Sequence, residues 1–252
     1  MSSLDALLLC LAFAGFSLVT VSYVNRRQMR RRLISQKIEQ MKRRIVELEE
    51  IVVTIEPLIE SKFILIYILN ELVDLIKKTR RLDPGSHYLE VNLASSEERL
   101  DLLHANKVKP ELWRMLNSDA AIARARFALN EAGRILRKRQ TLDELTPSEL
   151  QMYIAELSWA HSMVGVITLI GEGHQAVNRG DVTKAYSYYK SAQQILMHST
   201  HTDERRHQFI RELSEIMSNR RKAISLHLMP ETNYNPDSKT KNLIKPDDEP
   251  AI

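Results

Sequence analysis

The sequence predicts an all-α fold in which an N-terminal transmembrane helix leads through a coiled-coil-like stalk into a cytoplasmic helical bundle. Glycine and proline, which punctuate short strands, number only 7 and 8 in 252 residues. Leu, Ile, Ala, Glu, Arg and Lys dominate, and apolar residues recur at helical spacing. We expect an anchor at 1–25, a basic, heptad-patterned segment at 26–82, a linker at 83–94, a helical domain at 95–228 and a disordered tail at 229–252.

The anchor is predicted by an almost uninterrupted apolar run over residues 1–24, in which Asp5 is the single charge. About 20 residues at about 1.5 Å each span the roughly 30 Å hydrocarbon core of a bilayer. A cleaved signal peptide carries its positive charge before the apolar core and ends in a small-x-small site, and this run shows neither. We therefore expect the run to remain as a single-pass helix.

Five arginines follow the run and predict its orientation, because basic residues beside a span stay on the cytoplasmic side. We expect the N-terminus outside and the body in the cytoplasm. Each arginine near the surface contributes about 1 kcal/mol of attraction to anionic lipid. The predicted headgroup contacts are Arg26, Arg27, Arg30, Arg31 and Arg32.

The net charge of +4 is a local property of this juxtamembrane segment. Residues 26–44 hold nine basic residues against Glu39, so the rest of the chain sums to about −4. The body lacks the broad positive field of a nucleic-acid binder, and no nucleic-acid partner is expected, although a membrane-tethered nucleic-acid binder is one alternative. Basic clusters at 134–139 and 220–222 fall near predicted helix ends, where cations complement the helix dipole.

After the arginines, apolar residues alternate in steps of four and three, which is the spacing of a coiled-coil seam. We expect this seam to drive self-association into a homo-oligomer. Its positions are Ile34, Ile38, Met41, Ile45, Leu48, Val52, Ile55 and Ile59. Pro57 should break the helix, and residues 58–78, apolar on several faces, should form a central bundle helix or an oligomer interface.

The remaining elements follow from capping and turn residues. Asp83, Pro84 and Gly85 form a turn signal, and the chain should stay irregular to about residue 94. Thr146 followed by Pro147 and Glu149 is the best helix start in the sequence. The expected helices are 95–106, a short one from Pro110, 118–139, 147–178 and 203–228.

Small and aromatic residues at 173–192 have a specific spacing: Gly173, Gly180, Asp181, Ala185, Tyr189 and Ala192. The segment 168–198 resembles a single tetratricopeptide repeat, although Leu169, Ala176 and Met197 depart from the family pattern. One repeat does not bury a solenoid core. The resemblance implies a helix–turn–helix hairpin and protein binding through Gly173, Ala176, Tyr186 and Tyr189; the alternative is that these residues only let two helices pack.

A metal site is the main catalytic alternative. Glu204 and His207 have the Glu-x-x-His spacing of helical di-iron sites, but those sites need a second copy, and the nearest is Asp101 with His104. No nucleotide-binding, zincin or nucleophile-elbow motif occurs. We therefore expect no enzyme activity, no cofactor and no metal. The sequence predicts a membrane-anchored scaffold or adaptor that binds protein partners through its helical domain.

Overall fold

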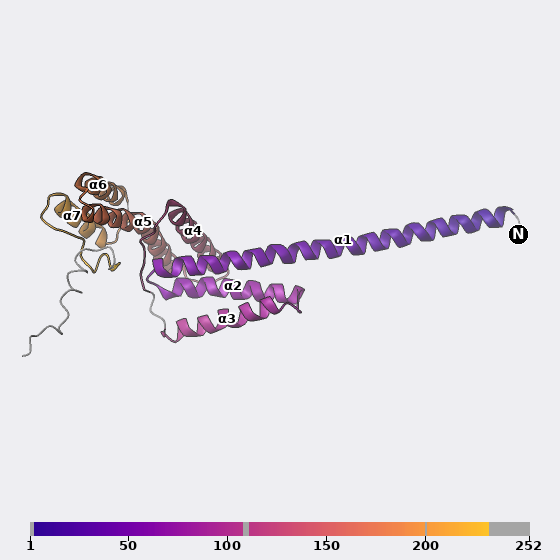
Figure 1. The fold of residues 1–252 in the computed structure, drawn as a ribbon. Helices are drawn as coiled ribbons and strands as arrows, with labels where there is room; N and C mark the ends of the chain where they lie inside the picture. Colours follow the sequence, from indigo (N-terminus) through magenta and orange to yellow (C-terminus); the bar gives the residue numbers. More distant parts are fainter. Residues whose placement is uncertain (1–2, 108–110, 200, 232–252) are drawn as a thin grey trace, which may run out of the picture.

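The structure, a computed structural model, describes residues 3–107, 111–199 and 201–231, and the side chains within them except those of residues 3–21 and 24. Within these residues it consists of seven α-helices and one 3₁₀ helix without a strand, which confirms the all-α prediction (Figure 1). The elements are α1 (Ser3–Ile55), η1 (Glu56–Leu58), α2 (Lys62–Leu82), α3 (His87–His104), α4 (Asp119–Thr141), α5 (Pro147–Asn178), α6 (Val182–His198) and α7 (Arg205–Met217).

Helix α1 has 53 residues, a length of about 80 Å. Its N-terminal part extends away from the body, and its C-terminal part packs on α2 and α4 (Figure 1). It ends at Ile55, just before Pro57, as predicted. The backbone of residues 3–24 continues this helix, while most side chains of the predicted anchor lie outside the described residues.

Helix α2 is the central helix of the bundle that α1 to α4 form, and it contacts α1, α3 and α4. We call the hydrophobic core of this bundle, to which the start of α5 also contributes, the first core. Its apolar side chains face all three neighbours, and Ile64, Ile68 and Ile76 are completely buried. Arg139 of α4 is buried too and binds Glu71 and Asp74 of α2 at 3.0 and 2.7 Å. A helix that is apolar on several faces is thus covered on several sides, as its sequence predicted.

Helix α5 belongs to two cores. Thr146 and Glu149 form the predicted capping box at its start. Tyr153 and Leu157 pack with α1, α2 and α4, whereas Ile167 and Ile170 pack with α6 and α7. Among the described residues, α5 is the one helix long and apolar enough to cross a membrane, but 56% of its most apolar window is buried in the body. Helix α5 is apolar on several faces because helices of both cores pack against it.

Helix α3 begins at His87, not at Ser95, so the predicted linker 83–94 is wrong beyond residue 86. The turn at Pro84 and Gly85 is present, but Leu89 and Leu93 bury themselves in the first core directly after it. Burial of these two leucines extends the helix over a stretch whose capping signals pointed to a later start.

The segment 111–117 is not helical, in contrast to the predicted short helix from Pro110, which itself lies outside the described residues. Its backbone N–H groups donate to distant acceptors. Trp113 donates to the Pro57 carbonyl at 2.7 Å, and Leu116 donates to the Thr168 hydroxyl at 3.2 Å. These partners replace the bonds that a helix would supply.

Helix α7 ends at Met217, well before the predicted end at residue 228. Asn219 adopts a left-handed conformation with φ of 62°, which stops the helix. The buried Glu212 carboxylate then accepts from the Ser225 N–H at 2.8 Å. Met229 and Glu231, predicted to belong to a disordered tail, are buried, and residues 232–252 lie outside the described residues.

Candidate functional site

Helices α5 and α6 pack on each other as a helix–turn–helix hairpin. Gly180 turns the chain with φ of +82°, and the Asp181 carboxylate accepts from the Lys184 N–H at 3.0 Å. Ala185 and Ala192 are buried where α6 packs on α5. Small residues on both helices allow the close contact.

The predicted partner-binding residues of this hairpin do not line a groove. Gly173, Ala176 and Tyr189 are buried between the helices, and a Cβ on Gly173 would lie 2.4 Å from Tyr189 Cε1. Tyr186 alone is accessible, with 49% of its surface exposed. The four residues are therefore split: three pack the hairpin, and one remains free to contact another molecule.

A buried polar pair closes the same interface. His174 Nδ1 and the Tyr189 hydroxyl are 2.7 Å apart. Burial lowers the pKa of His174 to about 4 and raises that of Tyr189, so both groups are neutral at pH 7. Both side chains are nearly inaccessible, and their arrangement stabilises the hairpin.

The heptad seam of α1 is used mainly inside the chain. Ile45, Leu48, Val52, Ile55 and Ile59 belong to the first core, and Met41 is also buried. Ile34 is exposed and Ile38 half-buried, on the part of α1 that leaves the body. The expectation that all eight positions serve self-association is therefore wrong for the buried six, because α2 and its neighbours already cover them.

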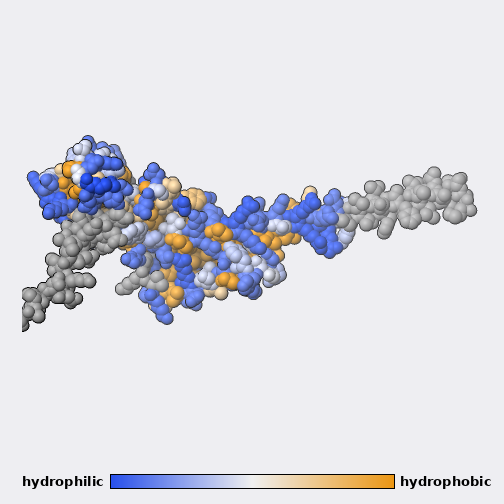
Figure 2. All heavy atoms as spheres, in the orientation of Figure 1, coloured by the Kyte–Doolittle hydropathy of each residue, from blue (hydrophilic) through white to orange (hydrophobic). Residues whose placement is uncertain are grey.

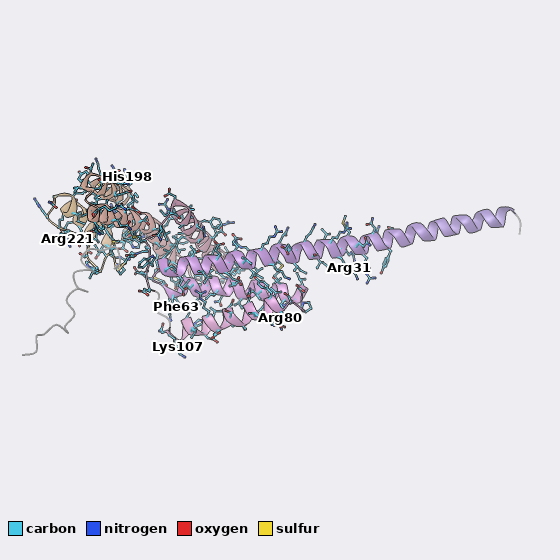
Figure 3. The ribbon with its side chains drawn as sticks, viewed as in Figure 1. Arg31, Phe63, Arg80, Lys107, His198 and Arg221 are labelled. Atoms are coloured by element: carbon cyan, nitrogen blue, oxygen red, sulfur yellow. The ribbon has the colours of Figure 1, made fainter. Side chains whose placement is uncertain are left out.

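The five arginines predicted to contact lipid headgroups are exposed on the projecting part of α1, where Figure 3 labels Arg31. Figure 2 shows this stretch as mainly hydrophilic. None of the five forms an ion pair with the part of the chain that the structure describes, in contrast to Lys42 and Arg44 further along α1. Their charges are available to an external anion.

The histidines considered as metal ligands lie apart from a donor set. His201 Nε2 is 2.8 Å from the Ala155 carbonyl oxygen, and its ring packs on Trp159. Within the described residues, neither Glu204 with His207 nor Asp101 with His104 belongs to a group of three or more side chains that could hold a metal ion.

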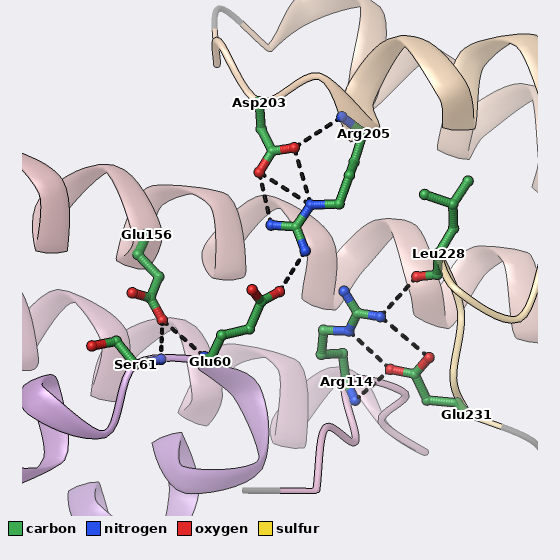
Figure 4. A network of polar contacts seen from close by, with 8 residues as sticks. All are labelled: Glu60, Ser61, Arg114, Glu156, Asp203, Arg205, Leu228 and Glu231. Carbon is green, nitrogen blue, oxygen red and sulfur yellow. Dashed lines mark hydrogen bonds and ion pairs between the residues drawn. The ribbon is translucent and has the colours of Figure 1, made fainter.

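Figure 4 shows a polar network that fixes α7 and the C-terminal segment to the body. Arg205 binds Asp203 at 2.7 Å and also binds Glu60. Glu156 accepts from the backbone N–H groups of Glu60 and Ser61, and burial nevertheless raises the pKa of its carboxyl. These residues are engaged with one another, so we assign them a structural role.

One hollowed surface of the body lies over α5, between α4 and α6. One hollow of about 460 Å³ is lined by all three helices. Two others continue it along the α4 and α6 sides. The one on the α6 side shares Ile195 with the first hollow and Ser158 with the one on the α4 side. We call this surface the α4–α6 groove and define it by Asp119, Arg126, Asn130 and Arg137 of α4, Ser158, His161, Ser162, Gly165 and Glu172 of α5, and Ser191, Gln194, Ile195 and His198 of α6.

Two arginines line the groove, and Asp119 and Glu172 line its end at the start of α4. Arg126 lies over Gly165, where a Cβ would be 2.9 Å from its Nη2, and its Nε is buried without a hydrogen-bond partner in the described residues. Arg137 is exposed at the far end of the α4 side. Neither forms an ion pair within the described chain, whereas Arg134, Lys138 and Arg139 all do. Burial, and secondarily the charge of Arg126, lowers the pKa of His161.

Sequence reasoning missed this groove because its residues come from three helices and form no local motif. A stripe of polar side chains on the otherwise apolar α5, at Ser158, His161 and Ser162, is the one signal in the sequence. No family model, curated protein or solved structure matches the chain.

Proposed function

We propose that this protein is a membrane-anchored, non-catalytic adaptor whose helical body binds partner proteins on the cytoplasmic side. The observation that carries the proposal is the continuity of helix α1. A single helix joins the apolar run, the five exposed arginines and the first core. A rigid rod of this kind would hold the body at a fixed distance from a bilayer.

Anchoring by residues 1–25 is supported by length, composition and the exposed arginines that follow. The test is alkaline extraction of membranes from cells that make the full chain, with protease protection of tags at each end. We expect the chain to resist extraction, and the C-terminal tag to be digested in inverted vesicles that shield the N-terminal tag.

Orientation by the arginines is tested by changing Arg26, Arg27, Arg30, Arg31 and Arg32 to Gln. The variant should insert in both orientations, because the charge asymmetry is lost. A matched control changes five exposed cations of the body, and it should keep the original orientation. The control positions are Arg179, Lys184, Lys190, Arg220 and Lys222.

Partner binding is assigned to the α4–α6 groove, since the hairpin residues expected for this role are mostly buried. Self-association is assigned to Ile34, which is exposed, and Ile38, which is half-buried, because the other six seam positions are buried. In-membrane crosslinking followed by mass spectrometry tests both assignments. A photoreactive side chain at Ser191 should crosslink a partner, and one at exposed Met152, which does not line the groove, should not.

A further inference from the structure

We infer that the α4–α6 groove binds an extended acidic segment of a partner protein, whose carboxylates bind Arg126 and Arg137. The inference rests on the proposed adaptor function and gives the chemistry of its partner. It is carried by the arginines that line the groove, by the scarcity of carboxylates there and by the polar side chains of the groove floor.

Arg126 is positioned but unpaired. Its guanidinium lies on the flat surface that Gly165 provides, and its buried Nε has no acceptor within the described residues. A cation partly removed from water without a counter-charge is unfavourable. An incoming carboxylate can accept two hydrogen bonds from one guanidinium, and would thereby supply the missing acceptor.

The carboxylates that line the groove lie at one end only. Asp119 and Glu172 line the hollow at the start of α4, which Arg126 also lines, although Arg126 forms no ion pair with either carboxylate in the described residues. From there to Arg137 and His198, the lining residues include no Asp or Glu. Among the other cations of α4, Arg134, Lys138 and Arg139 face carboxylates of the same chain, whereas Arg124 is exposed and lies outside the groove. The unpaired arginines therefore favour an acidic ligand and disfavour a basic one.

The floor of the groove suits an extended backbone. Hydroxyl and amide groups of Ser158, Ser191, Gln194 and Asn130 line its two side hollows. An extended segment presents unpaired N–H and C=O groups, which such side chains can bind. Arg126 and Arg137 are three helical turns apart, about 16 Å, a span covered by about five extended residues.

The test uses the full chain in detergent micelles and fluorescent ten-residue peptides. The probe has two Glu residues four positions apart in a Ser/Ala background, because side chains an even number of positions apart leave the same face of an extended segment. Matched probes carry Gln or Lys in their place. Binding is measured by fluorescence anisotropy at low and high salt. We expect the Glu probe to bind at least tenfold more tightly than the Gln probe, the Lys probe not to bind, and salt to weaken the binding.

The matched variants are Arg126→Gln and Arg137→Gln, with Arg124→Gln as control. Arg124 is exposed on the same helix, lines no part of the groove and has no ion pair in the described chain. Each groove variant should weaken the Glu probe about fivefold to tenfold, while the control should bind like the unchanged chain. Circular dichroism confirms that each variant is folded. Equal loss in the control, or equal binding of Glu and Gln probes, would overturn the inference.

Two further outcomes are informative. The chain itself carries an acidic segment at Asp247, Asp248 and Glu249. If the probe binds only after Asp247→Asn, Asp248→Asn and Glu249→Gln, the occupant is the chain's own segment, and the partner assignment is wrong. If the anchored chain crosslinks partners in membranes and both groove variants retain them, the adaptor proposal stands and the acidic-ligand inference fails.

Discussion

Gly173 and Tyr189 pack so closely that residue 173 has no room for a side chain. A Cβ there would lie 2.4 Å from Tyr189 Cε1 and 2.8 Å from Cδ1. The ring cannot withdraw easily, because its hydroxyl is held by His174 and its edges are buried against α5. The contact sets the distance between α5 and α6.

Gly173→Ala should therefore destabilise the protein by about 3 kcal/mol, the upper end of the usual cost of overpacking. Gly171→Ala is the matched control. Its Cβ would meet Met115 Sδ at 2.4 Å, but that atom belongs to a flexible side chain that can move, so the loss should be about 1 kcal/mol. Urea unfolding followed by circular dichroism measures both, and equal losses would show that the ring is free to shift.

Acid should destabilise the hairpin through His174. Its pKa is about 4 in the folded protein and near 6.5 in the unfolded chain, so the unfolded state binds the proton first as the pH falls. The contribution of neutral His174 to the free energy of unfolding is fully present above about pH 6.5. It is lost progressively down to about pH 4, by about 3 kcal/mol in total.

The measurement is urea unfolding between pH 4 and 8, comparing the unchanged chain with His174→Leu. The variant should lose this part of the pH dependence. His161, whose pKa is also lowered, is retained in both chains, and His161→Leu measures its share separately. Parallel stability curves for the unchanged chain and His174→Leu would contradict the prediction.

Local signals in the sequence predicted the elements whose ends depend on neighbouring residues. Thr146 and Glu149 cap α5 as expected, and Pro57 separates α1 from α2. The elements that depend on distant contacts were missed. Arg114 donates to Glu231, 117 positions away, and no pattern within a window of the sequence contains that information.

Some residues of the candidate site could also be predicted from the sequence, whereas others depend on contacts between distant segments. The exposure of Arg26 to Arg32 follows from composition, and the structure agrees. Tyr189 packs on Gly173, which is the alternative that the sequence left open, because the spacing that places an aromatic residue on the hairpin does not say whether it faces outward or inward. The α4–α6 groove depends on how three helices align, and that alignment is set by the core of α5.

The buried pair of Arg114 and Glu231 should hold the C-terminal segment in place. Arg114 Nε donates to Glu231 Oε1 at 2.9 Å, and its Nη2 donates to the Leu228 carbonyl at 2.9 Å. Glu231→Ala leaves a buried guanidinium without a counter-charge and should cost about 3–5 kcal/mol. Limited proteolysis should then cut near residues 224–231.

The double variant Arg114→Met and Glu231→Met separates the charge from the packing. Removing both charges and keeping similar volume should restore most of the stability lost in Glu231→Ala. If the double variant is as unstable as the single one, the segment is held by packing of Leu228 and Met229, not by the ion pair.

The two ends of the heptad seam should respond differently to a charge. Ile45→Glu places a carboxylate in the first core, where the isoleucine is completely buried, and should unfold the bundle, because an unpaired buried charge costs several kcal/mol. Ile34→Glu changes a residue that is 50% exposed and should change the unfolding free energy by no more than about 0.5 kcal/mol.

The effect of Ile34→Glu should instead appear in membranes, as a loss of crosslinking between copies through the projecting part of α1. The charge-matched control is Gln40→Glu, which lies on the exposed surface of the same helix outside the seam and should keep the crosslink. If Ile34→Glu and Gln40→Glu crosslink equally, α1 does not mediate self-association, and its seam serves only the intramolecular core.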